Sequence, residues 1–104
     1  MPNARFLVVW EFHVKPGAEK RFEAIYDPAG AWAMLFARDP EFVRTELQRD
    51  LRAPGRYLTL DYWTNEASYE QFRALHQAEY EALDKECGSL TESETLIGRF
   101  VVTG

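Results

Sequence analysis

A chain of 104 residues is long enough for one domain with its own hydrophobic core and leaves no room for a second. Hydrophobic residues make up 46% of it and charged residues 28%, which is typical of globular proteins and excludes an intrinsically disordered chain. The net charge of −5 repels phosphate backbones and anionic lipid headgroups, so nucleic acid and membrane surfaces are poor partners. We expect a single domain over residues 1–104.

The first predicted element is a strand over residues 5–14, which a turn at residues 15–17 ends. Its alternation puts an apolar set on one side and a second set, Leu7, Val9, Glu11 and His13, on the other. The apolar set comprises Phe6, Val8, Trp10, Phe12 and Val14. Because the second set becomes polar, we expect one dry face and one partly hydrated face.

Residues 18–37 carry apolar side chains at steps of three and four, the spacing of one helical stripe. Its members are Ala18, Phe22, Ile25, Ala29, Trp32 and Phe36. Pro28 interrupts the stripe, because its ring would clash with the carbonyl of Ala24 and it lacks an N–H donor. We expect two helical pieces, with Asp27 as the N-cap of the second and a restart over residues 31–37.

Residues 42–51 and 56–63 alternate as two strands joined by a turn at residues 53–55, which predicts a hairpin. In the first of these strands, Phe42 alternates in phase with charged residues such as Arg44 and Glu46, so we expect it on a charged face.

A second amphipathic helix follows, with capping oxygens at Thr64-Asn65 and a bend near Leu75. Its stripe comprises Tyr69, Phe72, His76, Tyr80, Leu83 and Cys87. Gly88 ends this helix, and residues 95–103 predict a last strand that Gly98 weakens or bulges.

The resulting order of elements is βαββαβ. It predicts an α+β, ferredoxin-like fold in which four antiparallel strands carry both helical segments on one face. We expect the other face to hold Leu7, Val9, Tyr57 and Thr59 among charged residues such as Glu46 and Asp61. That face would be too apolar for water and too polar for a core, which favours packing against a second copy in a homodimer.

The single cysteine, Cys87, cannot form an internal disulfide, and the first residues lack a basic segment followed by an apolar run. No apolar stretch approaches the ~20 residues needed to cross a bilayer. These features predict a cytoplasmic protein.

Three stretches resemble the antibiotic biosynthesis monooxygenase family: EFHVKPGAEKRFEAIY, the segment from Gly30-Ala31-Trp32 to Leu35-Phe36, and PEFVRTELQRDLRAPGRYLTLDYWTNEASYEQF. Together they cover most of the chain. The resemblance implies a dimeric α/β barrel with a pocket between the helices and the sheet of each subunit. Some members of the family oxygenate aromatic polyketides there without metal or flavin, the substrate supplying the electrons to O2. The resemblance therefore implies no cofactor.

Other members of the wider fold degrade haem with an Asn, a Trp and a His. This sequence departs from that pattern at all three comparable positions, Phe12, Phe72 and Ala82. We do not expect haem degradation by those three residues.

His76 is the candidate catalytic base, because a neutral imidazole on the inner stripe of a helix can accept a phenolic proton near neutral pH. Tyr80, one turn later, can hydrogen-bond a substrate oxygen. Aromatic side chains are the candidates for substrate binding: Trp10, Phe12, Trp32, Phe36, Tyr62 and Phe72. Ordinary core packing explains such stripes equally well. His76 and Glu79 alone do not make a metal site, so none is expected.

These observations favour a cofactor-independent monooxygenase that oxidises an electron-rich aromatic or quinol-type molecule with O2. A non-catalytic dimeric domain that binds a small ligand or acts in a stress response is the alternative. A third possibility is an isomerase or decyclase that uses His76 for proton transfer and needs no oxygen.

Overall fold

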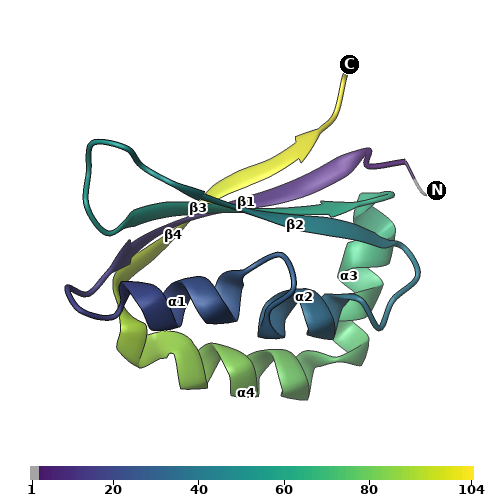
Figure 1. Cartoon of the computed structure of the whole chain (residues 1–104). Helices are drawn as coiled ribbons and strands as arrows, with labels where there is room; N and C mark the ends of the chain where they lie inside the picture. Colours follow the sequence, from purple (N-terminus) through teal and green to yellow (C-terminus); the bar gives the residue numbers. More distant parts are fainter. Residues whose placement is uncertain (1–2) are drawn as a thin grey trace.

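The chain folds as one antiparallel sheet with its helices on one side, in a computed structural model that describes residues 3–104 (Figure 1). Its elements are β1 (Phe6–Val14), α1 (Glu19–Tyr26), α2 (Ala31–Phe36), β2 (Phe42–Arg49), β3 (Arg56–Trp63), α3 (Glu66–Leu75), α4 (Gln77–Cys87), a 3-10 turn (Gly88–Leu90) and β4 (Thr91–Val101). The strand order is β2-β3-β1-β4. The predicted ferredoxin-like βαββαβ fold is confirmed.

The register of the strands determines which side chains share a face. In β1, Val8 lies opposite Asp61 of β3, and Trp10 lies opposite Thr59. Directly opposed residues of antiparallel strands point to the same side. Tyr57, Thr59 and Asp61 therefore lie on the helical side with Val8 and Trp10, where they are buried, and the prediction that they belong to the outer face is wrong.

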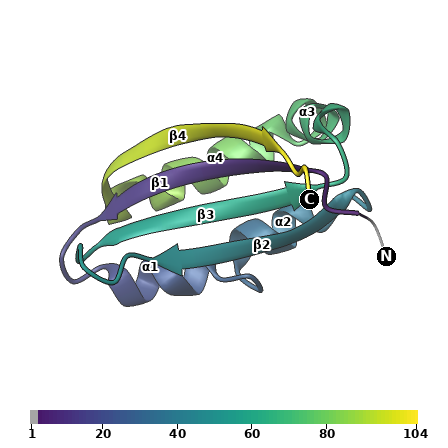
Figure 2. The same ribbon diagram turned by 90° about the horizontal axis from the view of Figure 1, so that it is seen from above.

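The outer face has an apolar centre and a polar border. Figure 2 looks onto this face, with the strands in front of the helices. The register places the following apolar residues on it: Leu7, Val9, Leu58, Leu60, Tyr62 and Phe100. Glu46 and Gln48 lie opposite Leu60 and Leu58, so charged and amide groups border this centre along β2.

Phe42 packs into the core, contrary to the predicted charged face. The register of β2 against β3 shifts between Phe42, opposite Trp63, and Arg44, opposite Tyr62. The extra residue, Val43, is a bulge that reverses the alternation for Phe42. Its ring centroid consequently lies 5.3 Å from that of Trp63.

The break between α1 and α2 lies where Pro28 predicts it, but Asp27 is not the N-cap of α2. Gly30 occupies that position. The Asp27 side chain instead accepts a hydrogen bond from the Ala29 N–H at 2.7 Å, inside the connecting turn. Gly30 passes so close to the end of α1 that a Cβ there would lie 2.4 Å from the carbonyl oxygen of Ile25.

The second helical segment divides at His76, close to the predicted bend. Asn65 caps α3 by accepting the Ser68 N–H at 2.8 Å, as expected. Strand β4 begins at Thr91, four residues earlier than predicted, because the chain enters the sheet directly after the 3-10 turn. Its register against β1 shifts between Gly98 and Leu96, next to the predicted irregularity.

Aromatic rings form most of the core between the sheet and the helices. Trp63 has no exposed surface and is packed edge-on against the ring of Phe36, at 5.7 Å between centroids. Phe22 stacks on Tyr26 at 4.1 Å at the other end of the layer. Within residues 3–104, no helix is long and apolar enough to span a membrane.

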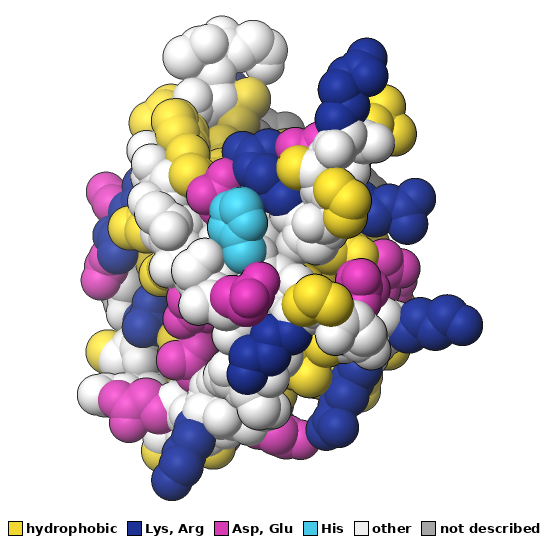
Figure 3. Space-filling view, turned by 90° about the vertical axis from the view of Figure 1, so that its left-hand side faces the viewer, with side chains coloured by type: hydrophobic (Ala, Val, Ile, Leu, Met, Phe, Trp, Pro, Cys, Tyr) yellow, Lys and Arg dark blue, Asp and Glu magenta, His cyan; other side chains and the backbone are white. Residues whose placement is uncertain are grey.

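The end of the molecule at the left of Figure 1 carries acidic and basic side chains intermixed, as Figure 3 shows. Arg56 joins β1 to the hairpin in this way: its Nε lies 2.6 Å from Glu11 and its Nη1 lies 2.8 Å from Asp50. Charges of both signs therefore neutralise each other locally.

The close approach at Gly30 generates a first prediction. Gly30→Ala would press a methyl group into the carbonyls of Ala24 and Ile25, and we expect it to lower the free energy of unfolding by roughly 1–3 kcal/mol or more. Gly88→Ala is the matched control, because nothing lies within 4 Å of its Cβ position and its φ of −60° is helical. Urea unfolding monitored by circular dichroism measures both. Equal stability of the two variants would contradict this account of the turn.

Candidate active site

A pocket of about 170 Å³ lies between the helical side of the sheet and the helices. Half of its lining is aromatic: Trp10, Phe12, Tyr26, Trp32, Phe36 and Tyr80. An engineered apolar cavity of about 150 Å³ holds benzene. The pocket therefore has room for one aromatic ring inside, and a larger fused-ring molecule would extend through its opening.

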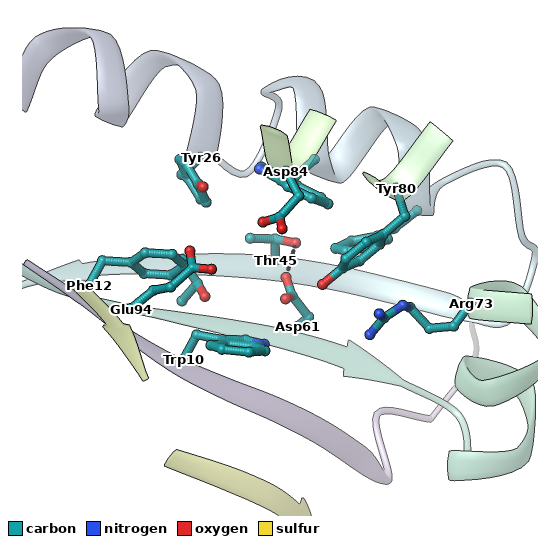
Figure 4. A pocket seen from close by; sticks show the side chains of 12 residues that line it. Trp10, Phe12, Tyr26, Thr45, Asp61, Arg73, Tyr80, Asp84 and Glu94 are labelled. Atoms are coloured by element: carbon teal, nitrogen blue, oxygen red, sulfur yellow. Dashed lines mark hydrogen bonds between the residues drawn. The ribbon is translucent and has the colours of Figure 1, made fainter. Parts of the chain in front are cut away.

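The aromatic walls come from strands and helices that face each other. In Figure 4, Trp10 and Phe12 extend from β1, while Tyr26 and Tyr80 approach from the helices. The Trp32 ring is edge-on to Tyr80 at 4.9 Å and lies 6.1 Å from Tyr26. Such a frame favours a flat, apolar guest.

Short side chains form the floor of the pocket. Thr45 of β2 and Thr59 and Asp61 of β3 point from the sheet towards the helices. The Thr45 hydroxyl donates a hydrogen bond of 2.7 Å to Oδ1 of Asp61, which is drawn as a dashed line in Figure 4. Burial raises the pKa of Asp61 to about 6, although the bond from Thr45 acts in the opposite direction.

One cationic group lines the pocket. The guanidinium of Arg73 lies over the ring of Tyr80, 3.7 Å from its centroid, and donates a hydrogen bond of 2.9 Å to the Tyr69 hydroxyl. Burial raises the pKa of Tyr80, so its hydroxyl stays protonated at neutral pH. The pocket thus presents a cation and a neutral O–H donor from α3 and α4.

Two further carboxylates, Asp84 of α4 and Glu94 of β4, line the pocket. Glu94 has a pKa raised by burial, and the negative charge of Asp84 adds to this effect. Among the described residues, no three His, Cys, Asp or Glu side chains lie close enough together to hold a metal ion.

Five of the eight residues predicted for the site line this pocket: Trp10, Phe12, Trp32, Phe36 and Tyr80. Three do not. Phe72 is buried in the core against Trp63, and Tyr62 lies on the outer face, where the Arg44 guanidinium covers its ring at 4.1 Å. His76 lies at the junction of α3 and α4.

The position of His76 follows from the break in the helix. Its ring packs on Phe72 with 4.7 Å between centroids, and its Nδ1 lies 3.0 Å from Glu79. The predicted stripe ran through the expected bend near Leu75 and placed His76 on the same side as Tyr80. The structure does not bring the two together at the pocket.

The family model for antibiotic biosynthesis monooxygenases matches residues 5–82. The chain belongs to the antibiotic biosynthesis monooxygenase family. SnoaB, a cofactor-independent oxygenase from Streptomyces nogalater, has a similar crystal structure at 26% identity and a TM-score of 0.77, over 98% of this chain and 96% of that one. A Bordetella bronchiseptica protein, proposed to be an antibiotic biosynthesis monooxygenase, shares 23% identity at the same TM-score, over 98% and 100% of the two chains. The comparison with curated proteins found no match.

The sequence pattern did not mark the charged residues of this pocket. Arg73, Asp84 and Glu94 look like surface charges along amphipathic elements. Asp61 is identified only by the register of the assembled sheet, in which it lies opposite Val8, a member of the apolar set in β1.

The buried carboxyl of Asp61 generates a second prediction. Its pKa is about 6 in the folded chain and about 3.9 in an unfolded one. The folded state therefore favours the protonated form, which stabilises the fold below about pH 4, and this stabilisation is lost as the pH rises through 6. Two pKa units correspond to about 3 kcal/mol.

Urea unfolding at pH 4 and pH 8 tests this. The gain in unfolding free energy of Asp61→Asn over the wild type should be greater at pH 8 than at pH 4 by about 2 kcal/mol, because part of the ~3 kcal/mol is already lost at pH 4. Met34→Ala, at an exposed side chain without an ionisable group, should show the same difference from the wild type at both pH values. A pH-independent effect of Asp61→Asn would show that the carboxyl titrates normally.

Proposed function

We propose that this protein is a cofactor-independent monooxygenase that oxidises an electron-rich aromatic or quinol-type molecule with O2. The single observation that carries the proposal is the aromatic pocket with ionisable groups at its floor and wall, in a chain of this family. The similarity to SnoaB supports the same reaction class.

The chemistry balances without a separate electron donor. A methylene carbon between two aromatic rings, as in an anthrone, becomes a carbonyl, and its two hydrogens leave with the second oxygen atom as water. A hydroquinone becomes a hydroxyquinone and water in the same way. The protein has to bind the ring, promote loss of a proton so that the anion can reduce O2, and exclude bulk water.

The pocket residues have distinct proposed roles. Trp32, Phe36, Trp10 and Phe12 would hold the flat ring by stacking and apolar contact. Tyr80, whose hydroxyl stays protonated, would donate a hydrogen bond to a substrate oxygen. His76 lies outside the pocket and has no part in this proposal.

Oxygen consumption tests the proposal. We expect the purified protein to consume O2 above the enzyme-free rate with at least one of anthrone, 1,8-dihydroxyanthrone, hydroquinone or 1,4-naphthohydroquinone, in the presence of a chelator. Thr59→Ile extends the pocket floor into the space for the ring and should lower kcat/KM about tenfold or more.

Met34→Ala is the matched control. Met34 lies on α2 with Trp32 but is 68% exposed, so its loss should leave the rate unchanged. Panel compounds that raise the melting temperature without being consumed would favour the non-catalytic binding domain instead. Equal turnover by Thr59→Ile and the wild type would remove this pocket as the site.

We also propose that a second copy of the chain covers the outer face of the sheet. The register places its apolar centre on the side of the sheet opposite the helices, and Phe100 at its border is 45% exposed. Strand β4, eleven residues long, pairs on one side with β1 and forms an edge of the sheet with largely exposed side chains. Apolar faces and long open edges are the surfaces that proteins cover by association.

Light scattering after size exclusion tests this association. The wild type at micromolar concentration should have twice the mass of the 12.1 kDa chain. Leu60→Glu, at the centre of the outer face, should give single chains, because it buries a charge in the interface. Leu51→Glu introduces the same charge at a 93% exposed loop position and should leave the dimer intact. Single wild-type chains would refute the dimer.

A further inference from the structure

Asp61 is the only Asp or Glu that is buried among residues 3–104, with 8% of its surface exposed. No Lys, Arg or His of the described chain forms an ion pair with it; its one recorded partner is the Thr45 hydroxyl on Oδ1. Burying an unpaired carboxylate is costly. The fold therefore retains at Asp61 a group that works against its stability.

A purely structural role does not explain this carboxyl well. Thr45 and Asp61 lie directly opposite each other on β2 and β3, and the backbone ladder already fixes that pairing. Two apolar side chains of similar size would pack there without a desolvation penalty. Asp61 lines the pocket, beside the space into which an aromatic ring fits. Strained or desolvated ionisable groups in a pocket are typical of functional sites.

We propose that Asp61 is the catalytic base of the pocket: the carboxylate that takes the proton from the substrate when it is activated for oxygen. This inference rests on the proposed function. The Thr45 hydroxyl holds one carboxylate oxygen, which leaves the other free to accept the proton.

The proton transfer balances over the reaction. The substrate's O–H or acidic C–H bond breaks, its electron pair stays on the substrate, and the proton moves to Asp61. The anion gives its electrons to O2, and a carbon–oxygen bond forms to give a peroxide. The proton returns from Asp61 to the peroxide, which becomes a hydroperoxide. The remaining C–H bond on the oxygenated carbon then breaks, its electron pair forms the carbonyl as the O–O bond breaks, and the departing hydroxide leaves with that proton as water. Asp61 is thereby restored.

The surroundings of Asp61 suit a base that must accept a proton from a weak acid. Burial raises its pKa to about 6, which narrows the gap to a phenol of pKa about 10 by two units. Arg73 from α3 supplies a positive charge for the substrate anion, and Tyr80 from α4 supplies a neutral donor. Asp84 from α4 and Glu94 from β4 also face the pocket.

Binding of two probes that differ only at a hydroxyl tests this without turnover. The wild type at pH 8 should bind 2-naphthol about tenfold or more tightly than 2-methoxynaphthalene, because the hydroxyl donates to a charged acceptor. This preference should fall as the pH drops through about 6. In Asp61→Asn it should be no more than about threefold at any pH, while Asp27→Asn should keep the wild-type preference.

Kinetics with any panel compound that turns over provides the second readout. Asp61→Asn should lose about 100-fold or more in kcat. Thr45→Val removes the bond that stabilises the charged carboxylate, so the acidic limb of the kcat/KM profile should move to higher pH. A purely structural role for this pair would lower activity equally at all pH values.

The outcomes separate this inference from the proposed function. If no panel compound consumes O2 but the hydroxyl preference disappears in Asp61→Asn, the oxygenase proposal fails and Asp61 stands as the group that faces the substrate hydroxyl. If folded Asp61→Asn keeps the preference or the wild-type kcat, the role of Asp61 is overturned.

Discussion

The pocket depends on the order in which large and small side chains follow one another along the helical side of β3. Four successive positions on that side are Tyr57, Thr59, Asp61 and Trp63. The two aromatic residues at the ends are almost completely buried, and their neighbours from the helices pack on them with ring centroids about 5 to 6 Å apart, as in the pairs of Tyr57 with Phe22 and Trp63 with Phe36. These contacts hold the helices away from the sheet at both ends of the strand. Between them the short side chains cannot reach across, so a chamber remains where a uniform set of large residues would give a filled core.

That arrangement has an energetic cost, which other parts of the fold must offset. A chamber loses the dispersion contacts of a packed core, and the carboxyl on its floor loses its hydration. The offset comes from the aromatic clusters at its two ends, because each buried ring removes a large apolar area from water. The lost packing and hydration are confined to the chamber, where a ligand would bind. The stabilising aromatic contacts lie at its two ends, outside the space for a ligand. A division of this kind is typical of a site in which function opposes stability.

Alternation and turn chemistry were sufficient to predict the order of the elements and the two helix breaks. The family resemblance implied the pocket, which five of the predicted aromatic residues line. Alternation could not tell which side of β3 faces the helices, because Leu58, Leu60 and Tyr62 on one side are as apolar as Tyr57 and Trp63 on the other. The register against β1 settles it, and register is a property of the assembled sheet. Phe42 was misplaced for a related reason: a one-residue bulge at Val43 reverses the alternation without any mark in the sequence.

The same reasoning explains why the sequence pattern favours His76, whereas the pocket contains Asp61. A histidine in a helical stripe is easy to find, whereas an aspartate in a strand looks like one more surface charge. Helix α3 ends at Leu75 and α4 begins at Gln77, so the apolar stripe is not continuous. At the junction, His76 contacts Phe72 and Glu79. Asp61 is placed instead by the sheet, and a hydroxyl from the adjacent strand fixes one of its oxygens. A group that must meet a bound ring at a defined distance is held more precisely by two paired strands than by a helix junction. Rigidity of the support therefore favours the strand carboxylate over the helix imidazole as the residue around which chemistry in this pocket is organised.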